Sequence, residues 1–260
     1  MLKDKQRNKY FDYLLIQYFR ISGNLKYDLE KINSNEVIIQ PHLGLGDTII
    51  CNGLIHKLSE SFDLIYLPIK DRYAEMIRYL FKENKKIKFF EVSYSNSTYD
   101  VLNFGNKNKI PILRIGFEKQ NNKPFNTWFY DQVGLDYEMS YKMFNLPKNE
   151  KQSVELYNHL LKYYKVENEN YNLIHCESYN KNFDLKGINN FKNIFVSKES
   201  DLFKNMFLYD HVIKNAKEIH CINSSFFHLV DRVSTNAKLY YHNVRHSNFY
   251  MSKKWNLIKY

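Results

Sequence analysis

Short β-branched runs alternate with segments of helical periodicity along most of this 260-residue chain. An apolar run at 37–40 comes before a helix expected at 48–62. The same order returns with a strand at 64–67, which Pro68 closes, and a helix at 73–82. Such alternation is typical of parallel strands joined by right-handed helical crossovers. The sequence therefore predicts an α/β fold with parallel sheets.

Further elements of the same kind continue this pattern in both halves of the chain. The first half has additional strands expected at 87–92, 101–104 and 112–115. The second half has helices expected at 154–164, 207–216 and 226–233, and strands at 173–176, 194–196, 219–222 and 238–242. The strand at 238–242 is expected to be the last one of the chain.

A polar and aromatic stretch with Pro124 and Pro147 separates the two series, and we place a domain junction there. The expected parts are an N-terminal helix and lead-in at 1–35, a Rossmann-like domain at 36–125, the junction at 126–148 and a second Rossmann-like domain at 149–260. The aromatic residues of the stretch, among them Phe125 and Phe129, form either the core of a hinge or a stacking surface for a sugar or a base.

The composition is basic, with 38 Lys and Arg against 28 Asp and Glu, a formal charge of +10. This charge attracts nucleotide diphosphates, lipid headgroups and nucleic acids, while a lysine-rich surface with solvated pairs such as Lys253 and Lys254 accounts for it equally well. Hydrophobic residues make up 44% of the chain, which excludes a disordered tail or a fibrous repeat. No apolar run reaches the roughly 18 residues of a membrane span, so we expect a soluble, cytoplasmic protein.

Three cysteines, Cys51, Cys176 and Cys221, are widely spaced and lie beside apolar residues. Their odd number and spacing are typical of reduced core thiols, and they favour neither a disulfide framework nor a zinc site.

Residues 3–22 are expected to form an amphipathic helix, since large apolar residues recur there every three or four positions: Tyr10, Leu14, Tyr18 and Ile21. Its first turns are basic, which opposes the helix dipole. The helix either packs against the body of the protein or lies on an anionic membrane surface, and the sequence leaves both open.

A glycine-containing turn at 40–48 joins the first strand of the 36–125 domain to its helix. The chain has only eight glycines, and Gly44, Gly46 and Gly53 fall within ten residues, which favours close approach of the backbone to a ligand. Asp47 is expected to cap the helix and to project its carboxylate toward a ligand. The turn is not a dinucleotide fingerprint, because Ile49 replaces the third glycine, and no Gly-Lys-Ser/Thr of a P-loop follows. An ordinary capped turn remains the alternative.

A second strand-to-helix turn, at 222–231, brings together hydroxyl groups and free backbone N–H groups at Asn223, Ser224 and Ser225. Such a helix start suits a phosphate group, and His228, one turn into the helix, and Lys238 are expected to flank it. A plain Ser N-cap explains the same residues. His175, at the end of another strand in this half, is expected at the same edge of the sheet.

These two motifs carry a resemblance to GT-B glycosyltransferases. The segment 42–54 resembles the Gly-x-Gly-Asp opening of heptosyltransferase-like enzymes, and 212–231 resembles their Asp-Ser-Gly-Pro-x-His-Leu-Ala donor motif. The second segment is also similar to the Asn-Ser-Ser/Thr-Phe-Ser-Trp-Trp segment of some fucosyltransferases. The resemblance implies two Rossmann-like domains that face a cleft, with acceptor recognition in the first and the nucleotide-sugar in the second.

The resemblance further implies a glycosyltransferase that moves a sugar from a nucleotide-sugar donor to a glycan or glycolipid acceptor. Asp47 would be the general base, with His42 as its substitute, and Asn223, Ser224, Ser225 and His228 would hold the diphosphate. No Asp-x-Asp motif occurs in the sequence, so we expect neither a metal ion nor another cofactor. Two alternatives remain open: a nucleotide-sugar epimerase or hydrolase of the same fold, and a non-catalytic protein that binds sugar or, less in keeping with its motifs, nucleic acid.

Overall fold

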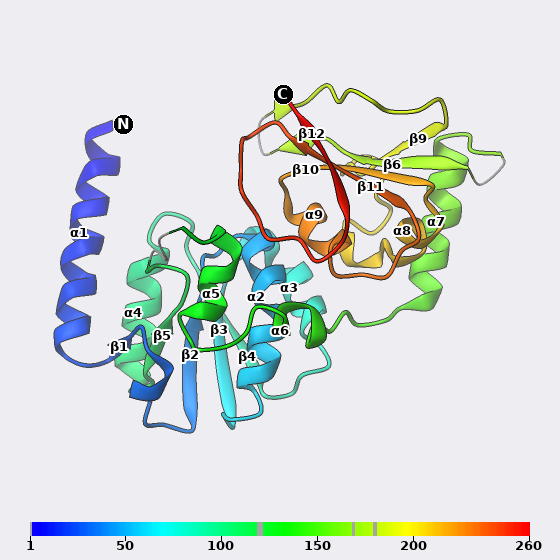
Figure 1. Ribbon diagram of the computed structural model, residues 1–260. Coiled ribbons are helices and arrows are strands. Elements are labelled where there is room, and N and C mark those ends of the chain that lie inside the picture. Colours follow the sequence, from blue (N-terminus) through cyan, green and yellow to red (C-terminus); the bar gives the residue numbers. More distant parts are fainter. Residues whose placement is uncertain (1, 119–121, 168–169, 179–180) are drawn as a thin grey trace. The chain divides into compact units, whose positions relative to one another are not determined.

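A computed structural model describes residues 2–118, 122–167, 170–178 and 181–260, with only the backbone for residues 2–9 (Figure 1). The chain divides into two compact units, Met1–Asn145 and Leu146–Tyr260. Each unit is built around its own five-stranded sheet in which every neighbouring pair of strands is parallel. The α/β fold with parallel sheets is therefore confirmed.

The sheet of the first unit has the strand order β1-β5-β2-β3-β4. Its strands are β1 (Leu25–Lys26), β2 (Glu36–Gln40), β3 (Leu64–Lys70), β4 (Ile87–Val92) and β5 (Ile112–Arg114). Its helices are α1 (Leu2–Ile21), α2 (Leu45–Leu58), α3 (Ala74–Leu80), α4 (Ser97–Asn108), α5 (Trp128–Asp131) and α6 (Met139–Lys142), with 3-10 turns η1 (Leu29–Lys31), η2 (Asp71–Tyr73) and η3 (Phe125–Thr127).

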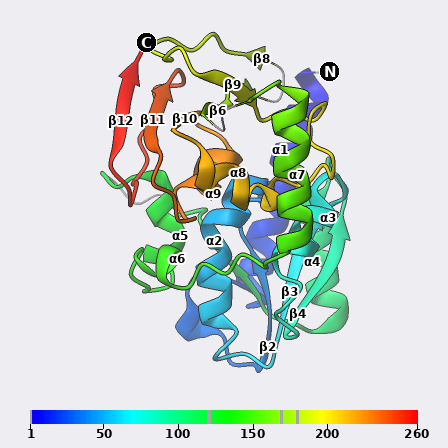
Figure 2. The same ribbon diagram turned by 90° about the vertical axis from the view of Figure 1, so that its right-hand side faces the viewer.

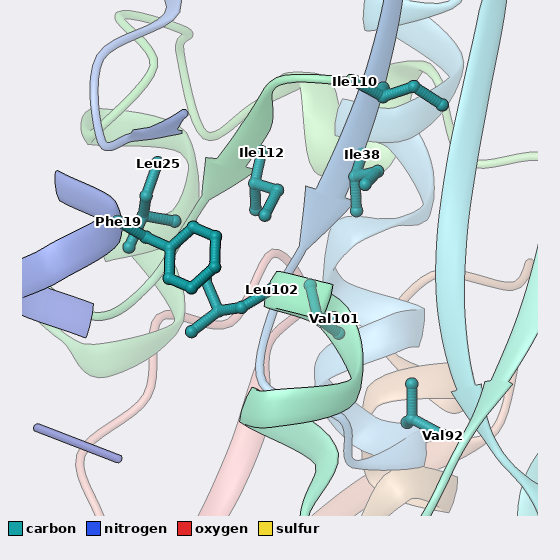
Figure 3. Packing of buried hydrophobic residues seen from close by; sticks show 8 residues of the cluster. All are labelled: Phe19, Leu25, Ile38, Val92, Val101, Leu102, Ile110 and Ile112. Carbon is teal, nitrogen blue, oxygen red and sulfur yellow. The ribbon is translucent and has the colours of Figure 1, made fainter. Parts of the chain in front are cut away.

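Helices α1 and α4 cover one face of this sheet. Figure 3 shows Phe19 of α1 and Leu102 of α4 packed with Leu25 and Ile112 of the sheet in one buried cluster. The opposite face carries α2, whose Gly53 lies so close to α6 that a Cβ there would stand 2.3 Å from the carbonyl oxygen of Met139. Gly53 thus serves packing between helices, and not the approach of a ligand expected from the sequence.

The sheet of the second unit has the strand order β12-β11-β10-β6-β9, and Figure 2 shows β10, β11 and β12 side by side. Its strands are β6 (Tyr171–His175), β9 (Lys192–Phe195), β10 (Glu218–Ile222), β11 (Lys238–Asn243) and β12 (Trp255–Lys259). A separate antiparallel pair consists of β7 (Glu177–Ser178) and β8 (Lys181–Asn182). The helices are α7 (Glu150–Tyr163), α8 (Asp210–Asn215) and α9 (Ser225–Val230), with the 3-10 turn η4 (Met206–Leu208).

Several sequence-based expectations about the elements are wrong. The run at 101–104 belongs to helix α4, because Val101, Leu102 and Gly105 are buried on one helical face. Strand β3 continues through Pro68 to Lys70; beyond Tyr66 it pairs only with β4, so a residue without an N–H is tolerated on its β2 side.

Two further differences lie in the second unit. The helix expected at 207–216 is divided into η4 and α8. The strand at 238–242 is not the last one, because β12 follows it and pairs with β11 in parallel. Strand β12 lies at the edge of the sheet with mostly exposed side chains, and it therefore lacks the apolar run that reveals a buried strand.

Candidate functional site

The turn between β2 and α2 lies at the carboxyl edge of the first sheet, where open α/β sheets bind their ligands. Helix α2 begins at Leu45 with Gly44 as its N-cap, so the expectation that Asp47 is the N-cap is wrong. Asp47 is the third residue of the helix, and Gly46 is the second. The Asp47 carboxylate accepts hydrogen bonds from the backbone N–H groups of Gly44 and of Asp47 itself. This is the return half of a capping box.

Gly44 is required by the position of this carboxylate. A Cβ on Gly44 would lie 2.6 Å from Oδ2 of Asp47. Its backbone φ of −89° is open to any residue, so the need for glycine arises from space alone. The glycine therefore allows the carboxylate to fold back over the start of the helix.

Asp47 is half-buried, and its protonation is unusual. Burial raises the pKa of the Asp47 carboxyl to about 7, although the N–H group of Gly44 and the charge of Lys70 act in the opposite direction. Burial likewise lowers the pKa of Lys70, at the end of β3, and its Nζ lies 4.9 Å from the ring centroid of Tyr94. A carboxyl group with such a pKa exchanges a proton near neutral pH, as a general base must.

His42 lies in the same turn, within a cage of phenylalanine rings. Its ring centroid is 4.4 Å from that of Phe117, 5.4 Å from that of Phe125 and 5.5 Å from that of Phe129. Burial, followed by the charge of Arg114, lowers the pKa of His42, so its imidazole is neutral at pH 7. Two of the aromatic residues from the expected junction thus pack around His42 within the first unit.

Arg114, which no sequence motif indicated, ends β5 at the same edge and is 7% exposed. Its Cζ lies 3.8 Å from the ring centroid of Phe117, and it forms a hydrogen bond with the side chain of Tyr27. Within the part of the chain that the structure describes, its Nε has no hydrogen-bond partner, and neither has Oε1 of Gln40, the residue paired with Arg114 in β2. The only signal in the sequence is an arginine within the apolar run at 110–115.

In the second unit, the turn after β10 also lies at the carboxyl edge of its sheet. Oγ of Ser224 accepts a hydrogen bond of 3.2 Å from the backbone N–H of Phe227, so Ser224 is the N-cap of α9 and Ser225 is its first residue. Nδ2 of Asn223 donates a hydrogen bond of 2.8 Å to Oγ of Ser247. The structure thus brings these three predicted residues together, and Ser224 has the capping role that the plain alternative gave it.

His175 lies at the end of β6, one strand away from this turn. Its ring stacks on that of Phe226 at 5.5 Å between centroids, and its Nδ1 has no hydrogen-bond partner among the described residues. Burial lowers the pKa of His175 to about 4, so the ring is neutral at physiological pH. It offers a neutral donor or acceptor at the strand ends.

The two flanking residues expected for a phosphate are not placed to bind one. His228 is buried between the rings of Phe227 and Phe249, and its burial holds the pKa well below its usual range. Lys238 is exposed at the first position of β11, where it pairs with Glu218 at the start of β10. The strands are parallel, so Lys238 lies at the opposite edge, roughly 13 Å or more from the turn after β10.

Lys253 differs from its expected role as a solvated residue. Its Nζ donates hydrogen bonds to the carbonyl oxygens of Val230 (2.8 Å) and Val233, at the end of α9. Burial lowers its pKa to about 8, against the effect of the neighbouring Asp231 carboxylate. Asp231 also accepts a hydrogen bond of 2.9 Å from Nε1 of Trp255. Hydrogen bonds of Lys253 and Trp255 therefore hold the start of β12 and the residue pair before it against the end of α9.

Within the described ranges, no group of three or more His, Cys, Asp or Glu side chains is arranged to hold a metal ion. In the same part of the chain, no helix has the length and apolarity to cross a bilayer. Cys51 and Cys221 are buried and Cys176 is half-buried, and burial raises the pKa of the Cys176 and Cys221 thiols.

Among solved structures, the fold is similar to that of the glycosyl transferase family 9 protein from Veillonella parvula DSM 2008. The TM-score is 0.54 at 9% sequence identity, and the match covers 88% of each chain. No known protein family matches the sequence, and no curated protein does. The likeness shows a fold in common with a glycosyltransferase, and the two parallel five-stranded sheets are consistent with a GT-B-like architecture.

Proposed function

We propose that this protein is a glycosyltransferase that moves a sugar from a nucleotide-sugar to a hydroxyl group of a glycan or glycolipid, without a metal ion or other cofactor. The observation that carries the proposal is Asp47, a carboxyl group with a pKa of about 7 at the carboxyl edge of a parallel sheet. The fold shared with a family 9 glycosyltransferase supports the same reaction class.

In the proposed reaction, Asp47 accepts the proton of the acceptor hydroxyl while the oxygen of that hydroxyl bonds to the anomeric carbon of the donor sugar. The bond from that carbon to the diphosphate breaks, and its electron pair leaves with the nucleoside diphosphate. Asp47 is a better candidate than His42 because its pKa lies near neutral pH, whereas His42 is enclosed by three phenylalanine rings. His42 then contributes to the shape of the acceptor side.

The donor is assigned to the second unit. Asn223, Ser224 and Ser225 support this assignment, because they lie at the carboxyl edge of its sheet, where backbone N–H groups and hydroxyls suit a diphosphate. His175 lies on a neighbouring strand end and adds a neutral polar group. The buried His228 would act on the shape of the turn, and Lys238 has no part in the proposed site.

The test has two stages. In a thermal-shift screen against UDP-, GDP-, CMP- and dTDP-sugars, one nucleotide class should stabilise the protein by mass action. Asp47→Asn should keep that shift and lose turnover by about 10²-fold or more. Asp63→Asn, at an exposed position, is the matched control and should behave as the wild type.

Other results would overturn the proposal. Product formed without any acceptor would favour the epimerase or hydrolase. Absence of any nucleotide shift, together with a steeply salt-dependent affinity for oligonucleotides, would favour a nucleic-acid-binding protein. Full activity of Asp47→Asn would remove Asp47 from the mechanism.

A further inference from the structure

Helix α1 exposes a continuous apolar face to solvent. Among the described residues, six exposed large apolar side chains lie within twelve consecutive positions of this helix, with exposed fractions from 48% at Leu14 to 86% at Ile21: Tyr10, Phe11, Tyr13, Leu14, Tyr18 and Ile21. At 100° per residue, Tyr10, Leu14, Tyr18 and Ile21 form one stripe, with Phe11 and Tyr13 on either side. Soluble proteins rarely leave such a patch uncovered without a partner.

The opposite face of α1 fixes the helix in this orientation. Phe19 is buried among Leu25, Leu102 and Ile112, as Figure 3 shows, and Leu15 packs against the same cluster. Asp12 lies on this inner side too, where Arg114 interacts with it electrostatically. The apolar stripe therefore cannot turn inward without taking Phe19 out of the core.

The charge of the helix indicates what kind of surface covers the stripe. The first eight residues of α1 contain four cations, Lys3, Lys5, Arg7 and Lys9, and a single anion, Asp4. Arg20 is exposed near the other end, and the exposed stripe contains no acidic residue. The stripe is rich in tyrosine and phenylalanine, whose rings favour the boundary between headgroups and acyl chains.

We infer that α1 is an interfacial anchor whose stripe of Tyr10, Leu14, Tyr18 and Ile21 inserts into the surface of an anionic lipid bilayer. The helix lies in the plane of the membrane, with its rings at the level of the headgroups, and the positive charge of residues 2–9 attracts anionic lipids. The anchor is independent of the proposed transfer reaction, because no residue of the stripe belongs to the proposed active site. It would bring the first unit to a membrane whatever the acceptor is.

The test is co-sedimentation of the full chain with vesicles of phosphatidylcholine alone or with about 30% phosphatidylglycerol, at about 0.1 M salt. We expect binding to the anionic vesicles to be about tenfold stronger, and to weaken at higher salt. The variant Tyr10→Ser/Leu14→Ser/Tyr18→Ser should lose about tenfold in affinity for these vesicles. A control with the same composition, Tyr99→Ser/Tyr163→Ser/Leu202→Ser, replaces three exposed residues outside α1 and should bind as the wild type.

Circular dichroism of both variants checks that they are folded. The anchor is ruled out if the wild type does not bind anionic vesicles, if it binds neutral ones equally well, or if the α1 variant binds as well as the control. Light scattering tests the alternative that a second copy of this chain covers the stripe. A wild type that is a dimer, together with an α1 variant that is a monomer, would assign the stripe to that second copy. Vesicle binding by a monomeric wild type, lost only in the α1 variant, would establish the anchor.

Discussion

The carboxylate of Asp47 occupies the space that a side chain on Gly44 would take, since a Cβ there would lie 2.6 Å from Oδ2. Gly44→Ala should therefore displace the carboxylate and lower kcat about tenfold or more, because a misplaced base loses its catalytic geometry. Stability should change by less than about 1 kcal/mol, because only the end of a flexible side chain has to move. Steady-state kinetics and urea unfolding of the same preparation measure the two effects.

Gly53→Ala is the contrasting substitution. Here the new Cβ would meet a backbone atom, the carbonyl oxygen of Met139, at 2.3 Å. Overpacking against α6 should destabilise the first unit by about 1–3 kcal/mol, although alanine is the better helix former. Urea unfolding measures this effect, and a more stable variant would contradict the close packing of α2 and α6.

The pH dependence of the transfer reaction follows from Asp47. With a pKa of about 7, the carboxyl is mostly protonated at pH 6 and mostly ionised at pH 8. We expect kcat/KM to rise with pH to a plateau, with a midpoint of about 7, because only the ionised form accepts a proton. The residual activity of Asp47→Asn should lack this limb, and a midpoint near 4 would exclude Asp47 as the base.

The same carboxyl should make the first unit less stable above pH 7 than in mild acid. Its pKa is about 7 in the folded state against an ordinary value of 3.8, so the folded state binds the extra proton between these values and loses stability as pH rises through them. Asp47→Asn should remove this cost and stabilise the first unit by roughly 1–3 kcal/mol at pH 8, with little gain below pH 4. Fluorescence of Trp128 in a Trp255→Phe background follows this unit.

The second unit should lose stability in acid. His220 and His242 are fully buried, with Nδ1 of His220 3.0 Å from Nε2 of His242, and His242 also contacts the hydroxyl group of Tyr260 at 2.8 Å. Burial, His220 and Lys186 lower the pKa of His242 to about 4, whereas Glu218 partly offsets the effect of burial on His220.

The unfolded chain therefore binds more protons than the folded one between about pH 6.5 and 4, and stability falls as pH decreases through this window. Urea unfolding followed by Trp255 fluorescence in a Trp128→Phe background should show a lower midpoint at pH 5 than at pH 7. His242→Gln should weaken this dependence without abolishing it, because burial also lowers the pKa of His175 and of His228 in this unit. An unchanged slope would mean that the pair is not the source.

The predicted elements succeed where a segment is both buried and periodic. Strands β2, β6 and β10 and helix α2 are largely buried and rich in apolar residues, and the structure contains all of them. The pattern fails at 101–104, where a short, mostly apolar run lies within helix α4, and at β12, whose side chains are mostly exposed. Local pattern alone does not distinguish such cases, because tertiary packing decides them.

The candidate site shows the same division. The turn that contains Asp47 could be recognised because glycines are rare in the chain and two of them, Gly44 and Gly46, lie in it. The roles of Arg114 and Lys253 could not be recognised from the sequence, because they depend on partners far away along the chain, such as Tyr27 and Val230. The raised pKa of Asp47 could not be recognised from the sequence either, because burial in the folded protein produces it. Contacts of this kind exist only after the chain has folded.

The hydrogen bonds that Lys253 and Trp255 make to the end of α9 determine which of the two units can fold first during synthesis. Asp231, at the end of α9, receives its hydrogen bonds from Ser252, Lys253 and Trp255 only after residues 252–255 have left the ribosome, whereas the described strands of the first unit come from residues 25–114. Because domains fold as they emerge, the first unit can be finished while the second still lacks its edge strand. A ribosome that stalls after residue 250 would hold a folded first unit joined to an unfinished second one.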